Sequence, residues 1–289
     1  MVNDQIREDS GGGLSILHDF PFSIERVSND SPPPHRKKHH YHNTYELYYL
    51  NSGDRYYFIK DKTYHVKRGN LVLVKPYDIH TTSGVSKIGY DRYLIMFKRS
   101  FIGEISESAG INLFESYDND VHLIELSYQE QSFVESLLDR MLSEHKSEAP
   151  GHHDFLRAAM VQLLLIAARH AAESGEESDV VPMNKTVSAV AAYIINNYRE
   201  DITLDWISER FFISPCYFSR TFKRVTGLSF TEYLNGVRIK EAQRLLATTD
   251  NSIIEICEAV GYKSTTHFGR SFKSIAGMSP SEYRRIKRG

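Results

Sequence analysis

Cysteine and tryptophan are scarce in this sequence of 289 residues. It contains two cysteines, Cys216 and Cys257, and one tryptophan. Two cysteines cannot build a disulfide framework or a cysteine-rich zinc site, so a reducing compartment is expected. The N-terminus, MVNDQIREDSGGGLS, has neither the basic start nor the apolar stretch of a secretory signal. No apolar run approaches the roughly eighteen residues that a membrane span needs. We therefore expect a cytoplasmic protein with no membrane partner.

The net charge of −2 conceals an uneven distribution. From Asn184 onward the sequence holds 16 lysines and arginines against 10 acidic residues, whereas the part before it holds 19 against 27. A basic C-terminal part on an acidic body favours a polyanion as partner for that part alone.

The N-terminal half has the pattern of a small all-β unit. Residues 1–15 are polar, contain a Gly-Gly-Gly run and are predicted to be mobile. Across 16–126, short runs rich in Tyr, Val, Leu and Ile alternate with turn residues, which is typical of a β-barrel or sandwich. The expected strands cover residues 45–50, 55–60, 71–74, 93–97 and 121–126.

The remainder of the chain is predicted to be helical. Apolar residues at three-to-four spacing predict a helical hairpin over 127–173, broken by a Pro-Gly pair. The acidic, proline-containing stretch 174–183 suits an interdomain linker. Seven short to medium helices are expected over 184–289. The predicted fold class is therefore α+β, with two domains.

An internal repeat is the strongest pattern in the sequence. SPCYFSRTFKRVTGLSFTEYL starts at Ser214 and STTHFGRSFKSIAGMSPSEYR at Ser264, and nine of the first twenty positions are identical. Each copy has an N-capping serine, two phenylalanines one turn apart and a closing glycine. A short helix precedes each copy at an offset of 49, so the second turn is one residue longer, and Gly261 is the expected insertion. This order predicts two helix-turn-helix units.

Residues 184–289 resemble the C-terminal DNA-binding domain of AraC/XylS-type regulators. The resemblance is carried by VRIKEAQRLLATTDNSIIEICEAVGY, by FSRTFK and FGRSFK, and by the closing GMSPSEYRR. It implies that the second helix of each unit enters one of two successive major grooves of double-stranded DNA. The base-contacting residues that it implies are Pro215, Cys216, Ser219, Arg220, Thr265, Thr266, His267 and Arg270.

An arginine at the same place in both copies suits bidentate readout of guanine. The alternative is that these positions belong to solvated helix faces. Basic residues toward the helix ends are better candidates for phosphate contacts than for base contacts. These are Lys223, Arg224, Lys273, Arg284 and Arg285.

A second motif lies in the β-rich half. His40, His42 and Glu46, followed by Gly53, fit the first motif of the cupin superfamily, HxHx3Ex6G. Gly69 to Pro76 with His80 is a looser version of its second motif. Alternation along a strand places the two histidines, Glu46 and Tyr48 on the lumen side of the barrel, and His80 could complete the set. Such a set can bind a divalent metal.

Three interpretations of this cluster compete. It could be a metal-free effector pocket, the metal site of a cupin enzyme fused to a DNA-binding domain, or a local packing cluster. We favour the first, because the whole chain resembles AraC-type sensors, in which a cupin-like barrel binds a small molecule, often a sugar. The predicted effector-pocket residues are His40, His42, Glu46, Tyr48 and His80, with no metal or other cofactor.

The sequence thus predicts a transcription regulator rather than an enzyme. Its partners would be double-stranded DNA and a small-molecule effector, with RNA polymerase as a further candidate. The hairpin over 127–173 has apolar faces wide enough to pack on the barrel and on a second subunit, so a homodimer is expected.

Overall fold

The structure is a computed structural model that describes residues 21–29, 42–85, 89–103, 105, 110–173 and 184–288. Three predictions lie outside these residues: the mobile segment 1–15, the linker 174–183 and the placement of His40.

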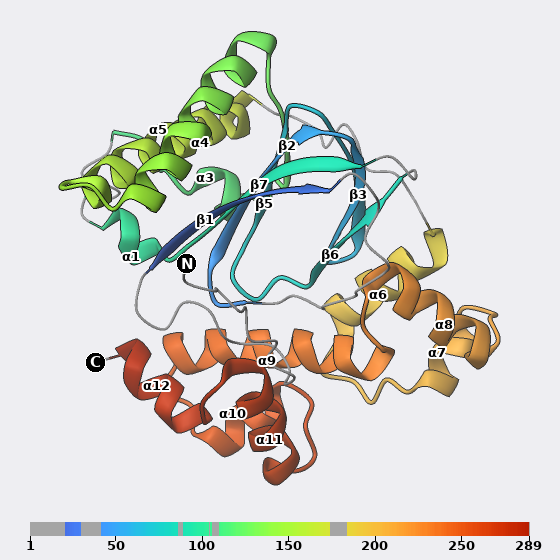
Figure 1. Cartoon of the computed structure of the whole chain (residues 1–289). Coiled ribbons are helices and arrows are strands. Elements are labelled where there is room, and N and C mark those ends of the chain that lie inside the picture. The colour runs from blue at the N-terminus through green and yellow to red at the C-terminus, as the bar shows by residue number, and fades with distance from the viewer. Residues whose placement is uncertain are drawn as a thin grey trace, which may run out of the picture.

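The N-terminal half is built from two antiparallel sheets that face each other (Figure 1), with a cluster of buried hydrophobic side chains between them. The five-stranded sheet has the order β1-β7-β2-β5-β8, and the three-stranded sheet has the order β4-β3-β6. Their bounds are β1 Phe22–Asn29, β2 Tyr45–Ser52, β3 Asp54–Ile59, β4 Lys62–Lys67, β5 Asn70–Val74, β6 His80–Gly84, β7 Tyr90–Phe97 and β8 Leu123–Glu125.

Strand β2 lies at the centre of the larger sheet and is buried on both faces. Leu47 and Tyr49 join the core beneath the helical hairpin, whereas Tyr48 and Leu50 join the cluster inside the barrel. This alternation follows from the two-residue repeat of a strand. Tyr48 therefore faces the lumen, as predicted.

All five predicted strands are present, but β1, β4 and β6 were missed. β4 (KTYHVK) and β6 (HTTSG) are short and polar, and each becomes a strand by pairing with β3. Such strands depend on their neighbours more than on intrinsic propensity. Two single-turn helices, α1 (Arg99–Ile102) and α3 (Glu115–Asp118), were also not predicted.

The helical hairpin is confirmed as α4 (Tyr128–Ser147) and α5 (His152–Glu173). Ser127 and Glu130 form a capping box that satisfies free N–H groups at the start of α4. By length and composition, α5 is apolar enough to cross a membrane, contrary to our reading of the sequence. Leu156, Met160, Leu163 and Leu164 are buried in the core that the hairpin shares with the barrel, and Leu165 packs against it half-buried. The face of α5 that packs on the barrel accounts for much of this apolar composition.

Seven helices follow the hairpin within the described residues, as predicted. They are α6 Lys185–Asn197, α7 Leu204–Arg210, α8 Pro215–Thr226, α9 Phe230–Thr248, α10 Ile253–Ala259, α11 Thr265–Ala276 and α12 Pro280–Arg288. Ser214 and Ser264 cap α8 and α11, and left-handed Gly227 and Gly277 end them. Helix α9 joins the two helix-turn-helix units and runs along one end of the barrel (Figure 1).

The insertion in the second turn is Lys263, so the prediction of Gly261 was wrong. Phe212 and Gly261 occupy the same place, with φ of 54° and 85°. The residue after each donates its N–H to the first helix of its unit, Ile213 to Ser208 and Tyr262 to Cys257, both at 3.0 Å. The two turns differ only after these bonds, where the second turn has the extra residue Lys263 before its capping serine.

Candidate DNA-reading face and effector site

The second helix of each unit presents a polar face to solvent. Phe218 and Phe222 of α8 are buried in one small core, and Phe268 and Phe272 of α11 are buried in another. Cys216, Arg220, Thr266 and Arg270 lie on the opposite side of these helices, whereas the other predicted base-contacting residues lie at the helix start or on the flank. Seven of the eight are exposed, and Ser219 is half-buried.

The predicted phosphate-contacting residues divide into two kinds. Lys223, Arg224, Lys273 and Arg285 are exposed. Arg284 is half-buried, donates to the carbonyl oxygen of Asn251, and has a buried Nε without a partner. Its guanidinium therefore ties α12 to the loop before α10, which leaves it less available to DNA than the other four.

Inside the barrel, three of the predicted effector residues meet. The Nε2 atom of His42 lies 3.0 Å from Glu46 Oε2, and the Nε2 atom of His80 lies 3.4 Å from the same oxygen. The hydroxyl of Tyr57 donates to the other carboxylate oxygen. Tyr48 stacks edge-on against Tyr57, with ring centroids 5.3 Å apart. The two motifs thus converge on Glu46, as the spacing predicted.

The electrostatics of this cluster depend on burial. Burial disfavours the charged form of Glu46, but the adjacent imidazoles of His80 and His42 outweigh this and hold its pKa well below the usual range. Burial also opposes the charged form of His80, yet the Glu46 carboxylate raises the pKa of that imidazole. Both shifts favour an ionised pair.

The cluster has two possible chemical uses. Ligand atoms of His42, Glu46 and His80 lie within 4.8 Å of one another, which suits a divalent metal. As they stand, both carboxylate oxygens of Glu46 are already bonded to protein groups. An acceptor and two imidazoles beside the rings of Tyr48 and Tyr57 equally suit a ligand rich in hydroxyl groups.

Two residues before His80, Asp78 connects this cluster to the DNA-binding half. The backbone carbonyl of Asp78 accepts a hydrogen bond from His80 Nδ1 at 2.8 Å. Its side chain is fully buried, pairs with Lys240 of α9, and lies 3.8 Å from the Lys60 ammonium group. Sequence reasoning missed Asp78 and Lys240, because nothing in the sequence pairs charges 162 residues apart.

Apolar and hydrogen-bonded contacts accompany this ion pair. Phe58 and Ile79 of the barrel belong to the same buried cluster as the first helix-turn-helix unit. The Tyr233 hydroxyl on α9 donates to the carbonyl of Lys60 at 2.6 Å. A cavity of about 330 Å³ lies beside these contacts. We call this surface between the barrel and α9, centred on Asp78 and Lys240, the interdomain latch.

Comparison with known proteins agrees with both halves of this architecture. Residues 21–180 match the AraC-like ligand binding domain, and residues 207–286 match a helix-turn-helix domain. The chain belongs to the AraC family. This AraC-family protein is accordingly a DNA-binding transcription regulator with an effector-binding domain.

Curated relatives match over different lengths. The activator RhaS of Pectobacterium atrosepticum is 23% identical over 247 residues, which cover 84% of this chain and 86% of that protein. The melibiose operon regulatory protein of Escherichia coli is 32% identical over 100 residues, 35% of this chain and 33% of that protein. The regulator YtdP of Bacillus subtilis is 38% identical over 105 residues, which span only 14% of its own length.

Proposed function

We propose that this AraC-family regulator reads two successive major grooves with α8 and α11, under the control of a carbohydrate bound in the barrel. The observation that carries the DNA-reading part is the pair Arg220 and Arg270. They occupy the same position of two equivalent helices, both are exposed, and each lies on the side opposite two buried phenylalanines. A forked guanidinium in this position can bind the O6 and N7 atoms of guanine.

The proposed effector site is the lumen around Glu46. Carboxylate and imidazole groups can bind sugar hydroxyls, and the rings of Tyr48 and Tyr57 can pack against the apolar face of a sugar ring. A regulator of a melibiose operon is among the relatives, which supports a carbohydrate as the class of ligand.

The latch offers a route from effector to DNA. A ligand that takes over the bond between His80 and Glu46 would shift the strand end that also carries Asp78. Asp78 holds Lys240 on the helix that joins the two DNA-binding units. Effector binding would then change the population of latched molecules, because the two states would bind the ligand differently.

The DNA-reading part is tested by dividing the chain. The fragment 180–289 is expected to bind duplex DNA, and the fragment 1–174 is expected to fold without binding it. Selection from random genomic fragments, followed by sequencing, identifies the sites. DNA binding that is confined to the N-terminal fragment would contradict the proposal.

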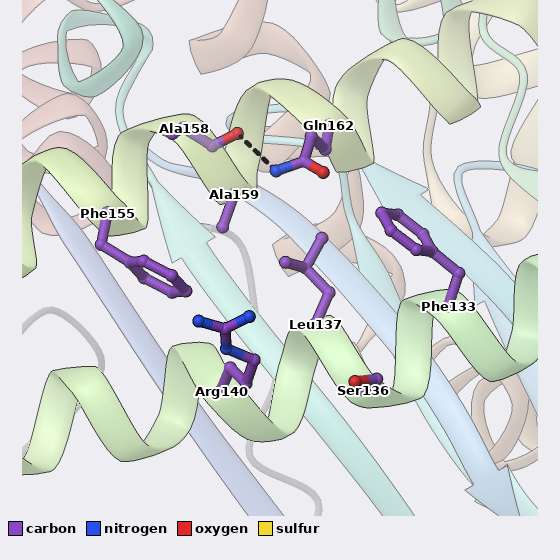
Figure 2. Close-up of a pocket in the computed structure, with 8 residues that line it drawn as sticks. All are labelled: Phe133, Ser136, Leu137, Arg140, Phe155, Ala158, Ala159 and Gln162. Carbon is purple, nitrogen blue, oxygen red and sulfur yellow. Dashed lines mark hydrogen bonds between the residues drawn. The ribbon is translucent and has the colours of Figure 1, made fainter.

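We also propose a homodimer formed through the hairpin. A groove of about 170 Å³ between α4 and α5 is lined by both helices (Figure 2). Phe133, 46% exposed, stands at one end, and the Arg140 guanidinium lies 5.2 Å from the Phe155 ring at the other. We expect Phe133→Asp to convert a dimer to a monomer in sedimentation, and Tyr128→Asp, at the exposed start of α4, to leave the dimer intact.

Contact with RNA polymerase is a further expectation from the resemblance.

The second candidate function is a metal-dependent cupin enzyme, which the His42, Glu46 and His80 geometry favours. We expect instead that protein purified without chelator holds well under one equivalent of divalent metal, and that His42→Ala leaves the barrel folded. If the purified protein instead holds one equivalent of metal and His42→Ala loses it, the result would favour the metal-dependent enzyme over the proposed function.

A further inference from the structure

The barrel interior also contains two arginines. Arg55 of β3 shares a strand face with Tyr57 and Ile59, and Arg92 of β7 shares one with Tyr90. These neighbours belong to the buried interior cluster, so both guanidinium groups turn inward. The Arg92 guanidinium lies 5.5 Å from the Tyr48 ring centroid. Arginine is seldom placed inside a barrel of this size, because an unpaired buried charge is costly.

Arg55 has donors that the protein leaves unsatisfied. Its side chain is 7% exposed, Nη2 donates to Thr82 Oγ1 at 3.0 Å, and the buried Nε has no hydrogen-bond partner. Within the described residues, no carboxylate forms an ion pair with it. The guanidinium stacks 4.2 Å from the Tyr90 ring centroid, which fixes its position but supplies no acceptor.

Tyr48 adds a second unsatisfied donor. The residue is 1% exposed and its hydroxyl is buried without a partner. Burial raises the pKa of Tyr48, so the hydroxyl keeps its proton at neutral pH and can donate. Arg92, on the same face of the sheet, pairs at 3.4 Å with the exposed carboxylate of Glu25 on the neighbouring edge strand. Buried polar groups are almost always bonded, so donors that converge without an acceptor indicate a missing partner.

We propose that Arg55, Arg92 and Tyr48 form an anion subsite, and that the effector is an acidic sugar whose carboxylate or phosphate group they bind. This inference rests on the proposed carbohydrate effector. The ring hydroxyls would face Glu46 and the imidazoles, and the anionic group would face the two arginines. The lumen therefore has an acceptor end and a donor end, and a neutral sugar would leave the donor end unsatisfied.

The test is calorimetric titration of the full chain with five probes. They are D-glucuronate, D-galacturonate, glucose 6-phosphate, D-glucose and D-galactose. We expect an acidic probe to bind at least tenfold more tightly than the neutral sugar from which it derives, D-glucose or D-galactose. Comparing the uronates with glucose 6-phosphate shows whether the subsite prefers a carboxylate or a phosphate group. Arg55→Met and Tyr48→Phe should each remove most of this preference, with roughly a 10- to 100-fold loss for the arginine. Arg68→Met, an exposed arginine of the same barrel, should change nothing.

Unfolding of the ligand-free variants adds a measurement that needs no probe. If the donors serve a ligand, Arg55→Met and Tyr48→Phe remove unsatisfied groups and should leave the melting temperature unchanged or higher. A marked fall in both would show that they support the fold and would overturn the inference. Equal affinity for acidic and neutral sugars, or no binding by any probe, would also overturn it, while the DNA-binding assay separately decides the proposed function.

Discussion

Arg220 and Arg270 are the side chains through which base recognition is most directly testable. We expect Arg220→Ala and Arg270→Ala each to cost about 1–3 kcal/mol of binding free energy and to relax preference at one base position. The two relaxed positions should lie about one DNA turn apart, roughly 10 base pairs. The measurement is binding to a saturation-mutated operator at fixed salt.

Lys273 provides the matched control for this pair. It is exposed on α11, and Lys273→Ala should weaken all operators alike and reduce the salt dependence by about one charge. If the arginine variants instead weaken every operator equally, the two arginines contact phosphates and the base-reading assignment is wrong.

The Glu46–His80 pair makes a second prediction, on pH. The pKa of Glu46 is lowered, so its contribution to stability is present above the unfolded value of about 4.3 and is lost as pH falls. The pKa of His80 is raised, so its contribution is complete below the unfolded value of about 6.5 and is lost as pH rises through the folded value. The pair therefore stabilises the barrel most between these pH values.

Denaturant unfolding at several pH values checks this. Between pH 6.5 and 8.5, the free energy of unfolding should fall by about 1.4 kcal/mol for each unit by which the pKa of His80 is raised. His80→Gln should remove this component. An identical pH profile for the variant and the parent protein would show that His80 does not titrate with the fold.

At the scale of elements, the tight turns of the two helix-turn-helix units differ at one equivalent position, which is Phe212 in the first turn and Gly261 in the second. A Cβ atom on Gly261 would lie 2.7 Å from the carbonyl oxygen of Arg199, which is backbone and cannot move aside. Phe212 has the same left-handed backbone, but its side chain is 95% exposed. We expect Gly261→Ala to cost about 1–3 kcal/mol of stability.

The matched change is Phe212→Gly, which should stabilise by about 0.5–1 kcal/mol because glycine relieves the left-handed strain. Thermal unfolding of both variants measures the effects. Equal and small effects at the two turns would mean that the contact between Gly261 and Arg199 does not constrain the fold.

The elements show how far sequence reasoning extends. The repeat, the capping serines and the hairpin were predictable because they depend on residues close in sequence. The strands β4 and β6 were not, because their polar residues pair only once β3 is in place. In the effector site, Glu46, His42 and His80 followed from motif spacing. Arg55 and Arg92 carried no motif, and only the strand parity of the folded barrel turns them inward.

At the scale of the whole molecule, the latch holds the barrel against α9. Removing Lys240 would leave the buried Asp78 carboxylate with Lys60 at 3.8 Å as its nearest cation. Because a buried carboxylate that keeps only this more distant cation is destabilised, we expect Lys240→Met to open the interface. Solution scattering should show a larger radius of gyration, and hydrogen exchange should increase along α9.

Arg244→Met is the control, because Arg244 pairs with Glu241 on the same helix and makes no ion pair with any barrel residue that the structure describes. It should leave the scattering profile unchanged. The isolated fragment 180–289 should bind DNA no more weakly than the full chain, since the recognition faces are already exposed in the latched state. An unchanged radius in Lys240→Met would show that apolar contacts alone hold the halves together.

The repeat within one chain also gives the bound operator a polarity. Two-fold dimers of single helix-turn-helix units read palindromes, whereas here α9 joins two units in fixed head-to-tail order. The proposed reading residues differ as well, with Pro215 and Cys216 on α8 against Thr265 and Thr266 on α11. One chain must then recognise an asymmetric sequence in a single orientation. If the two helices read DNA as proposed, inverting that sequence in front of a gene would point the barrel and its hairpin away from the promoter, and we expect regulation to depend on the orientation of the operator.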